Sequence, residues 1–247
     1  MREFDSREFH LADLVARKAA VAARISVCLP ARDEAATVGD VVAAIPDELV
    51  DEIVVIDDGS TDKTASVATA AGARVISTKP AGKGDAMRRG LEETTGDIVV
   101  YLDADVRNFE RHFVTGLVGP LLADDAIQFV KGWYARPTAD GPEGGGRVTE
   151  LVAKPLLRML FPAIPPIRQP LSGEVAARRP LLEKLTFAGG YAVDLALLLD
   201  AFAAVGSPAI AEVDLGVRVH RNRPLDQLAP QAEAILTAAL ERAGQFK

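Results

Sequence analysis

Asp103 and Asp105 are the residues whose type and spacing suggest chemistry most directly. Alternate residues of an extended segment point the same way, so both carboxylates can face one cleft. Paired hard oxygens suit Mg²⁺ or Mn²⁺, which can bridge to a diphosphate while keeping some water ligands. Because the pair directly follows the apolar run 98–102, we interpret it as a metal and diphosphate site rather than as a solvated turn.

Three further segments carry groups that suit anions or a metal. Lys83 stands between two glycines at the expected start of a helix, where backbone amides and positive charge favour phosphate. Arg147 and Thr149 follow three glycines, whose amides can wrap an anion beside the planar guanidinium. His220 follows an expected strand and can ligate a metal as neutral imidazole. A helix-capping turn, a flexible loop and a structural histidine are the respective alternatives.

The residues after His220 extend that last segment. Asn222 can contact a substrate hydroxyl or phosphate, and the arginines on either side of it, Arg221 and Arg223, can meet a pyrophosphate. The segment therefore predicts contacts to both a metal and a phosphorylated ligand.

Strands and helices alternate over the first half of the chain and must position these groups. Short β-rich runs are expected as strands at residues 25–29, 53–56, 74–77 and 98–102. This spacing predicts a parallel sheet that helices cover on both faces. Ligands bind at the carboxyl ends of strands in such sheets, and the polar segments 30–34, 57–60 and 103–105 fall there. Ser60 or Thr61 is expected to cap the helix that follows.

The second half is less regular. Strands are expected at 127–133 and 210–219, with helices at 148–160, 191–202 and 225–242. A loop rich in proline and glycine is expected at 137–147, and an exposed amphipathic helix is expected to lead into the first strand. No clean linker separates the halves, so we expect one domain.

Composition excludes several classes of function. Lys and Arg number 28 against 35 Asp and Glu, a net charge of −7 that disfavours nonspecific nucleic-acid binding. The single Cys28 lies in an apolar run and excludes an internal disulfide framework or a multi-cysteine metal site. No apolar run approaches the roughly 18–20 residues that cross a bilayer, and the N-terminal stretch lacks a signal-peptide core. We therefore expect a cytoplasmic protein.

These motifs, in this order, resemble known glycosyltransferases. The early ones are similar to GT-A glycosyltransferases and comprise Pro30-Ala31-x-x-Glu34, Asp57-x-Gly59-Ser60, Gly82-Lys83-Gly84 and Asp103-x-Asp105. The later ones resemble the glucosyl-3-phosphoglycerate synthase family of actinobacteria and comprise Val130-Lys131-Gly132-Trp133-Tyr134, Gly146-Arg147-Val148-Thr149, Gln169-Pro170-Leu171-Ser172-Gly173-Glu174, Gly190-Tyr191 and His220-Arg221-Asn222-Arg223-Pro224. The similarity runs from about residue 24 to residue 228.

The resemblance implies a fold and a reaction. The fold would be a single GT-A domain over residues 1–247, a Rossmann-like, mostly parallel sheet flanked by helices. Residues 24–106 would form the nucleotide-sugar-binding half, 107–224 the acceptor-binding half and 225–247 a C-terminal helix. The reaction would move glucose from UDP-glucose to the 2-hydroxyl of 3-phosphoglycerate with retention, using Mg²⁺ or Mn²⁺. A homodimer is also implied.

Roles follow from the resemblance residue by residue. Contacts to the nucleotide would come from Pro30, Ala31, Glu34, Ser60, Lys83 and Asp103. Asp105 and His220 would ligate the metal. Gly146, Arg147, Thr149 and Asn222 match the acceptor site, and Tyr191 is expected to bind substrate. The residues expected at the reacting sugar are Asp105, Lys131, Leu171 and Asp194.

Several alternatives stay open. The sequence offers no obvious glutamate nucleophile for a double displacement, which favours a same-face mechanism. Asp58 and Asp194 depart from the family pattern, as does the segment 32–33, so GDP-mannose or GDP-glucose is an alternative donor. A polyprenyl-phosphate acceptor is disfavoured by the anion loop at 144–149 and by the lack of anchoring helices. A non-catalytic nucleotide-sugar-binding protein is disfavoured by the intact acidic pair and His220.

Overall fold

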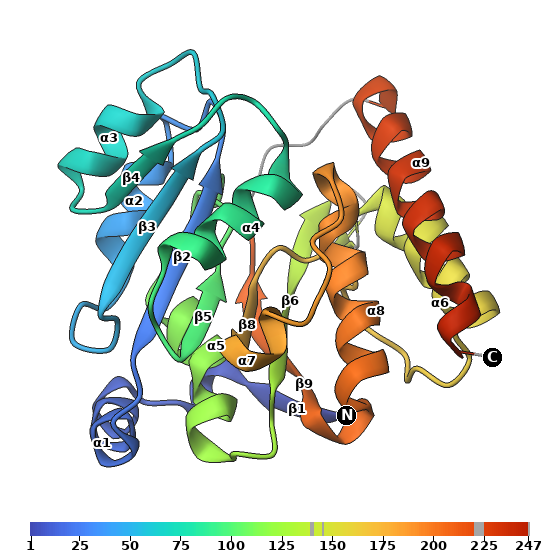
Figure 1. Cartoon of the computed structure of the whole chain (residues 1–247), viewed down its shortest axis with the longest axis horizontal. Helices are drawn as coiled ribbons and strands as arrows, with labels where there is room; N and C mark the ends of the chain where they lie inside the picture. The colour runs from blue at the N-terminus through green and yellow to red at the C-terminus, as the bar shows by residue number, and fades with distance from the viewer. Residues whose placement is uncertain (139–140, 145, 220–224, 247) are drawn as a thin grey trace.

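A twisted sheet runs through the whole molecule (Figure 1), in a computed structural model that describes every residue except 139–140, 145, 220–224 and 247. In this described part, eight strands follow the order β1-β9-β6-β8-β5-β2-β3-β4, and β7 pairs with β6 beside them. The strands are β1 (Arg2–Asp5), β2 (Ile25–Ala31), β3 (Glu52–Asp57), β4 (Arg74–Ser77), β5 (Ile98–Tyr101), β6 (Phe129–Thr138), β7 (Gly141–Gly144), β8 (Val175–Arg178) and β9 (Ile210–Val217).

Strand direction brings the chemistry to one edge of the sheet. Pairings β2–β3, β2–β5, β3–β4, β6–β9 and β1–β9 are parallel, whereas β8 runs antiparallel to both β5 and β6. The carboxyl ends of β2, β3, β5, β6 and β9 therefore share one edge with the amino end of β8. The predicted mostly parallel α/β sheet is confirmed.

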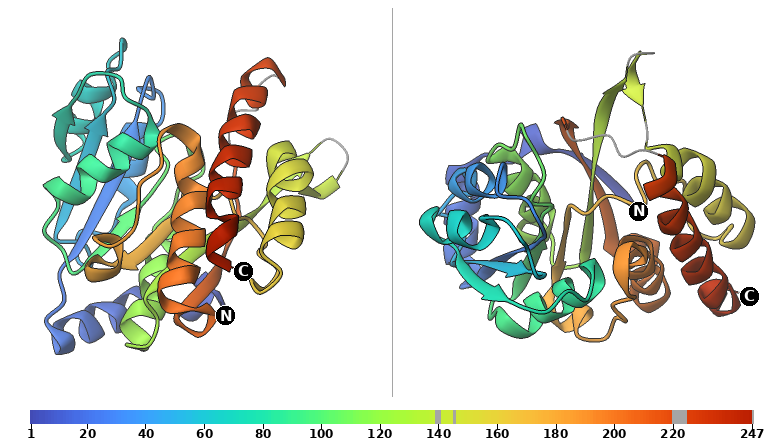
Figure 2. Two further views of the ribbon diagram at one scale, coloured as in Figure 1. Left: turned by 45° about the vertical axis from the view of Figure 1, so that its right-hand side comes forward. Right: turned by 90° about the horizontal axis from the view of Figure 1, so that it is seen from above.

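Helices cover both faces of this sheet (Figures 1 and 2). Their bounds are α1 (Leu11–Val21), α2 (Val38–Ala44), α3 (Thr64–Ala70), α4 (Lys83–Glu93), α5 (His112–Ala123), α6 (Lys154–Leu160), α7 (Arg179–Leu182), α8 (Val193–Val205) and α9 (Leu225–Arg242). Side chains of α1, α2, α3 and α5 enter one apolar core, and side chains of α4, α6, α7, α8 and α9 enter the other.

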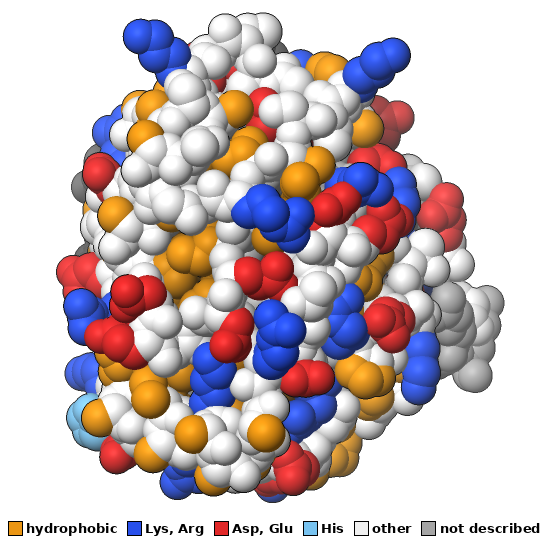
Figure 3. Space-filling model, turned by 60° about the vertical axis from the view of Figure 1, so that its left-hand side comes forward, with side chains coloured by type: hydrophobic (Ala, Val, Ile, Leu, Met, Phe, Trp, Pro, Cys, Tyr) orange, Lys and Arg blue, Asp and Glu red, His pale blue; other side chains and the backbone are white. Residues whose placement is uncertain are grey.

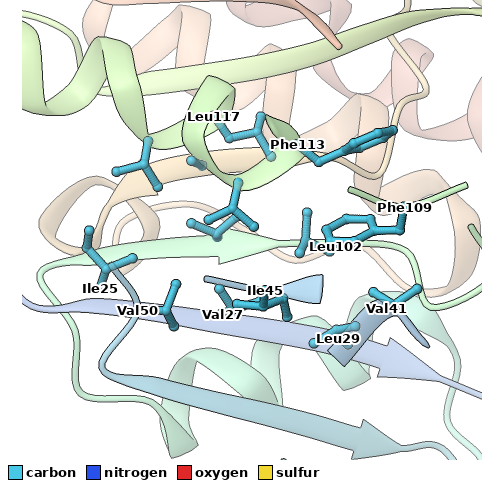
Figure 4. Close-up of a cluster of buried hydrophobic side chains, with 14 of the residues drawn as sticks. Ile25, Val27, Leu29, Val41, Ile45, Val50, Leu102, Phe109, Phe113 and Leu117 are labelled. Atoms are coloured by element: carbon cyan, nitrogen blue, oxygen red, sulfur yellow. The ribbon is translucent and has the colours of Figure 1, made fainter. Parts of the chain in front are cut away.

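Alternate residues of a strand in this sheet enter different cores. Val27 and Leu29 of β2 join the core under α2 and α5, which Figure 4 shows, while Cys28 between them joins the core under α4. Because alternate residues of a strand point to opposite faces, an uninterrupted apolar run is what a strand buried on both faces requires.

The structure corrects several sequence-based expectations. The chain begins with strand β1, which pairs with β9, before the predicted N-terminal helix. The predicted loop 137–147 contains β7 as the partner of β6, and the predicted helix 148–160 starts as a π-helix over Thr149–Ala153. Helix α3 begins at Thr64 after Lys63, so neither Ser60 nor Thr61 caps it. The predicted helix 225–242 is confirmed as α9.

Charged side chains of both signs lie on the surface, as the counts of 28 basic and 35 acidic residues lead one to expect. Acidic and basic side chains lie next to one another over the face shown in Figure 3. Across the described part of the chain, no helix combines the length and apolarity that a membrane crossing needs.

Close packing fixes helix α4, which carries Lys83 at its first position. A Cβ on Gly90 would lie 2.0 Å from Sγ of Cys28 on β2, and a Cβ on Gly84 would lie 1.8 Å from the carbonyl oxygen of Ala188. Only glycine lets the helix approach this closely, so α4 is held between the sheet and the segment before α8.

Gly90→Ala is expected to reduce the free energy of unfolding by about 1–3 kcal/mol, because the added methyl overpacks a rigid interface. Cys28→Ala removes the clashing sulfur, so the double variant Gly90→Ala/Cys28→Ala should recover most of the loss. Urea denaturation of the four proteins measures this coupling. Additive losses in the double variant would show that Gly90 and Cys28 do not form the limiting contact.

Candidate active site

A cavity of about 430 Å³ opens at the edge where the strand ends meet. This volume is typical of sites for small molecules, which enclose roughly 300–1,000 Å³. Most of the predicted site residues line it, namely Pro30, Ala31, Glu34, Lys83, Asp103, Asp105, Gly146, Arg147, Leu171, Tyr191 and Asp194. Further lining comes from Arg32, Asp33, Asp58, Arg136 and Arg218. One cavity thus brings together the residues predicted for donor and acceptor.

Arg218, just beyond β9, organises the acidic side of the cavity. Its Nη1 donates to Oδ2 of Asp103 at 2.9 Å and to Oε1 of Glu174 at 2.8 Å, and its Nη2 donates to Oδ1 of Asp105 at 2.6 Å. Ala104 and Asp105 lie in a turn rather than in the expected extended segment. The two carboxylates nevertheless converge, because one guanidinium binds both.

Burial and charge oppose each other at Arg218, whose side chain is 3% exposed. Burial would lower the pKa of Arg218, but the surrounding carboxylates, Glu174 foremost, raise it well above its usual value. Burial raises the pKa of Glu174 despite the adjacent guanidinium. The cluster therefore holds a permanent cation among three acidic groups.

Lys83 is the second cation that binds Asp103. Its Nζ donates to Oδ1 of Asp103 and to Oδ2 of Asp194, each at 2.9 Å. Burial would lower the pKa of Lys83, but Asp103 and Asp194 raise it above its usual range. Burial likewise opposes ionisation of Asp103, yet Lys83 and Arg218 together hold its pKa below the usual range. Asp103 is therefore a carboxylate fixed from both sides.

Asp194, in the first turn of α8, lines the cavity and carries an acceptor without a described partner. Its Oδ1 is buried and has no hydrogen-bond partner among the described residues. Its main-chain oxygen accepts a 3.1 Å hydrogen bond from Nζ of Lys131, which is fully buried. Burial lowers the pKa of Lys131 to about 8 and raises that of Asp194. Oδ1 is thus a buried acceptor, without a partner among the described residues, on a side chain that lines the cavity.

A divalent metal fits the acidic wall of this cavity. The side chains of Asp103 and Asp105 are 21% and 28% exposed, so hard oxygens reach the solvent-accessible space while Arg218 holds them in place. No group of three or more potential ligands occurs among the described residues. Asp105 can therefore supply part of a coordination shell that diphosphate oxygens and water complete. The predicted ligand His220 lies outside the described residues, as do Arg221, Asn222 and Arg223.

Three predicted residues do not belong to the described lining of the cavity. Among the described residues that line the cavity, Ser60, Lys131 and Thr149 do not appear. Oγ of Ser60 accepts a 2.9 Å hydrogen bond from the backbone N–H of Asp33, so Ser60 supports the loop that follows β2. Lys131 supports Asp194, as described above, and Thr149 is buried beside Gly146.

Sequence reasoning missed several residues that shape the site. Asp58 accepts hydrogen bonds from the backbone N–H groups of Ala81 and Gly82 at 2.7 and 2.9 Å, and so fixes the turn before α4. Arg218 stands two residues before His220, and Glu174 lies within a motif already quoted. The position of Arg218 after a strand was the available signal, because the three carboxylates that it binds are 44 or more residues away in the sequence.

Comparisons with known proteins agree with this geometry. The model of glycosyl transferase family 2 matches residues 26–183. Glucosyl-3-phosphoglycerate synthase of Mycobacterium tuberculosis is 49% identical over 238 residues, covering 89% of this chain and 74% of that protein.

Two crystal structures of that M. tuberculosis synthase superpose closely. The complex with phosphoglyceric acid gives a TM-score of 0.91 at 47% identity, covering 99% of this chain and 88% of the other. The complex with Mn²⁺, UDP-glucose and phosphoglyceric acid gives a TM-score of 0.88 at 48% identity, covering 96% of this chain and 84% of the other. The predicted GT-A architecture is confirmed. The chain belongs to glycosyl transferase family 2 and, within it, to the glucosyl-3-phosphoglycerate synthase family.

Proposed function

We propose that this chain transfers glucose from UDP-glucose to the 2-hydroxyl of 3-phosphoglycerate and so forms glucosyl-3-phosphoglycerate. One observation carries the proposal: a single cavity joins Lys83, Asp103, Asp105 and Asp194 to the loop at Gly146 and Arg147. The M. tuberculosis relative, with the same fold, has been crystallised with Mn²⁺, UDP-glucose and phosphoglyceric acid together.

The donor is assigned to the carboxyl ends of β2, β3 and β5. Pro30 and Ala31 at the end of β2, with Glu34 just beyond it, form the part of the cavity wall where a nucleotide base and ribose would lie. Lys83, at the amino end of α4, places positive charge and backbone amides near the diphosphate. A divalent metal held by Asp105, with His220 as its predicted second ligand, would stabilise the charge of the departing UDP.

The sugar is assigned to the part of the wall formed by Asp194 and Leu171. Oδ1 of Asp194 would accept a hydrogen bond from a sugar hydroxyl, while Lys83 holds Oδ2 and fixes the carboxylate plane. Glu174 is fully buried behind Arg218 and cannot reach a substrate. This arrangement supports a same-face course, in which the departing phosphate takes the proton of the acceptor hydroxyl.

The acceptor is assigned to the other end of the cavity. Arg147 and Gly146 line it next to the π-helix that starts at Thr149, and Tyr191 lines it from the segment before α8. An acceptor with both a phosphate and a carboxylate requires several donors of this kind. Asn222 remains a predicted contact.

We further propose that the enzyme is cytoplasmic and homodimeric. The only cysteine in the sequence, Cys28, is a buried free thiol, which suits a reducing compartment. Large apolar side chains are exposed on the neighbouring elements η2 (Thr149–Ala153), α6 and α9, namely Leu151, Met159, Leu236 and Leu240. Figure 2 shows α6 and α9 side by side on one flank of the molecule, where a second copy could cover them.

Purified protein is expected to form glucosyl-3-phosphoglycerate from UDP-glucose and 3-phosphoglycerate with Mn²⁺ or Mg²⁺, and to lose activity in EDTA. A donor panel with GDP-glucose, GDP-mannose and ADP-glucose, followed by mass spectrometry, measures donor preference. No product from any donor would contradict the proposal, and product from D-glycerate but not from 3-phosphoglycerate would contradict the acceptor assignment.

Asp105→Asn is expected to weaken Mn²⁺ binding in the presence of UDP by about 100-fold or more, since even outer residues of metal sites contribute roughly 10–100-fold. Isothermal titration calorimetry measures the affinity. Asp125→Asn, which changes an almost fully exposed aspartate, is the matched control and should stay within about twofold of wild type. Unchanged Mn²⁺ affinity in Asp105→Asn would remove Asp105 from the proposed metal site.

Sedimentation velocity is expected to give the mass of a dimer, about twice the 26.2 kDa of the chain. Leu240→Glu, in the exposed face of α9, should shift the sedimentation toward the monomer because it places a charge in an apolar interface. Val21→Glu, an exposed apolar position on α1, is the control and should leave the dimer intact. A wild-type monomer at assay concentration would refute the dimer.

A further inference from the structure

Arg136, near the end of β6, faces the acceptor end of the cavity without a role assigned to it so far. A Cβ built on Gly146 would lie 2.7 Å from Nη1 of Arg136 and 3.4 Å from Oγ1 of Thr149. The guanidinium therefore lies directly against the glycine loop, and the absence of a side chain at position 146 makes room for it. Two arginines, Arg136 and Arg147, consequently line the same end of the cavity.

Tyr134 holds Arg136 in this position. Nη2 of Arg136 donates to the Tyr134 hydroxyl at 2.9 Å, and its Cζ lies 5.1 Å from the ring centroid. Nη1 of Arg218 donates to the same hydroxyl at 2.7 Å. The buried ring thus fixes the distance between Arg136 and the acidic cluster on the donor side, so Arg136 is not a freely moving surface arginine.

Arg136 retains hydrogen-bonding capacity that the protein does not use. Its Nε is buried and has no partner in the part of the chain that the structure describes. Within that same part no carboxylate pairs with Arg136, whereas three carboxylates bind Arg218. A guanidinium has five donors, and a buried unpaired donor is unfavourable. An anion that enters the cavity would give this guanidinium, whose Nη1 lies against Gly146, a partner of opposite charge.

We propose that Arg136 binds the phosphate group of the acceptor, together with the loop at Gly146 and Arg147. The assignment rests on the proposed function. Two guanidinium groups, those of Arg136 and Arg147, line this end of the cavity beside Gly146, which suits a doubly charged tetrahedral group better than a singly charged carboxylate. The acceptor carboxylate then lies nearer the reacting hydroxyl, away from Arg136.

The test compares Arg136→Met with wild type by isothermal titration calorimetry, using protein saturated with UDP and Mn²⁺. The ligands are 3-phosphoglycerate, glycerol 3-phosphate, which lacks the carboxylate, and D-glycerate, which lacks the phosphate. Arg136→Met should bind both phosphorylated ligands about 10- to 100-fold more weakly, as expected for a lost hydrogen bond between charged groups. Its affinity for D-glycerate should change by less than about twofold, and Arg136→Lys should recover part of the loss.

Arg168→Met is the matched control. Arg168 also stacks on an aromatic ring of β6, with Cζ 4.4 Å from the Trp133 centroid, but the described lining of the cavity does not include it. Its variant should bind all three ligands like wild type. An unchanged affinity of Arg136→Met for UDP and Mn²⁺ would confirm that this variant is folded.

Other outcomes overturn the proposal. Equal weakening of 3-phosphoglycerate and D-glycerate, with glycerol 3-phosphate unaffected, would place Arg136 at the carboxylate. No change for any ligand would make Arg136 purely structural. Because binding is measured without turnover, wild type that binds 3-phosphoglycerate but transfers no glucose to it would contradict the proposed function and leave the phosphate assignment standing.

Discussion

The buried guanidinium of Arg218 is the interaction on which the architecture of the site depends. It binds Asp103 and Asp105 after β5 and Glu174 before β8, so three segments of the chain are fixed at one point. A charge removed from water is strongly destabilising unless it is paired and hydrogen-bonded. Because Arg218 is buried, the carboxylates of Asp103, Asp105 and Glu174 have to lie beside it and neutralise its charge. Arg218 and Lys83 together bind four acidic side chains, those of Asp103, Asp105, Glu174 and Asp194, and this excess of acidic groups suits a divalent cation at the accessible pair Asp103 and Asp105.

That cluster also joins the two ends of the reaction cavity. Asp103 is shared between Arg218 of the second half and Lys83 of the first, and Lys83 continues the chain of contacts to Asp194. On the other side Arg218 reaches Arg136 through the hydroxyl of Tyr134. Donor and acceptor groups therefore belong to one connected set of buried polar contacts. Strands β5 and β8 also pair directly in the sheet, so the segment that carries Asp103 and the segment that carries Glu174 are joined by backbone hydrogen bonds as well.

Sequence reasoning succeeded where the signal is local. Continuous apolar runs predicted β2, β3, β4 and β5, and polar residues directly after three of these strands predicted the donor wall.

Sequence reasoning failed where the signal depends on distant partners. Strand β1 has four residues and is defined by pairing with β9, and β8 is equally short. Arg218 and Arg136 are recognisable only once folding brings Tyr134 between them, because an arginine after a strand is unremarkable in a sequence.

Two side chains that line the cavity, Asp194 and Arg136, each carry a polar atom without a described partner and are expected to contribute to discrimination between ligands. Within the described residues, Oδ1 of Asp194 and Nε of Arg136 are buried without a hydrogen-bond partner. A buried acceptor or donor of this kind is unfavourable until a ligand satisfies it, and a ligand that lacks the matching group leaves that penalty in place. Sites that hydrogen-bond a hydroxyl or a charged group therefore reject analogues more strongly than apolar pockets do. Since Lys83 and Tyr134 fix these two side chains, we expect selectivity to arise from these rigid contacts.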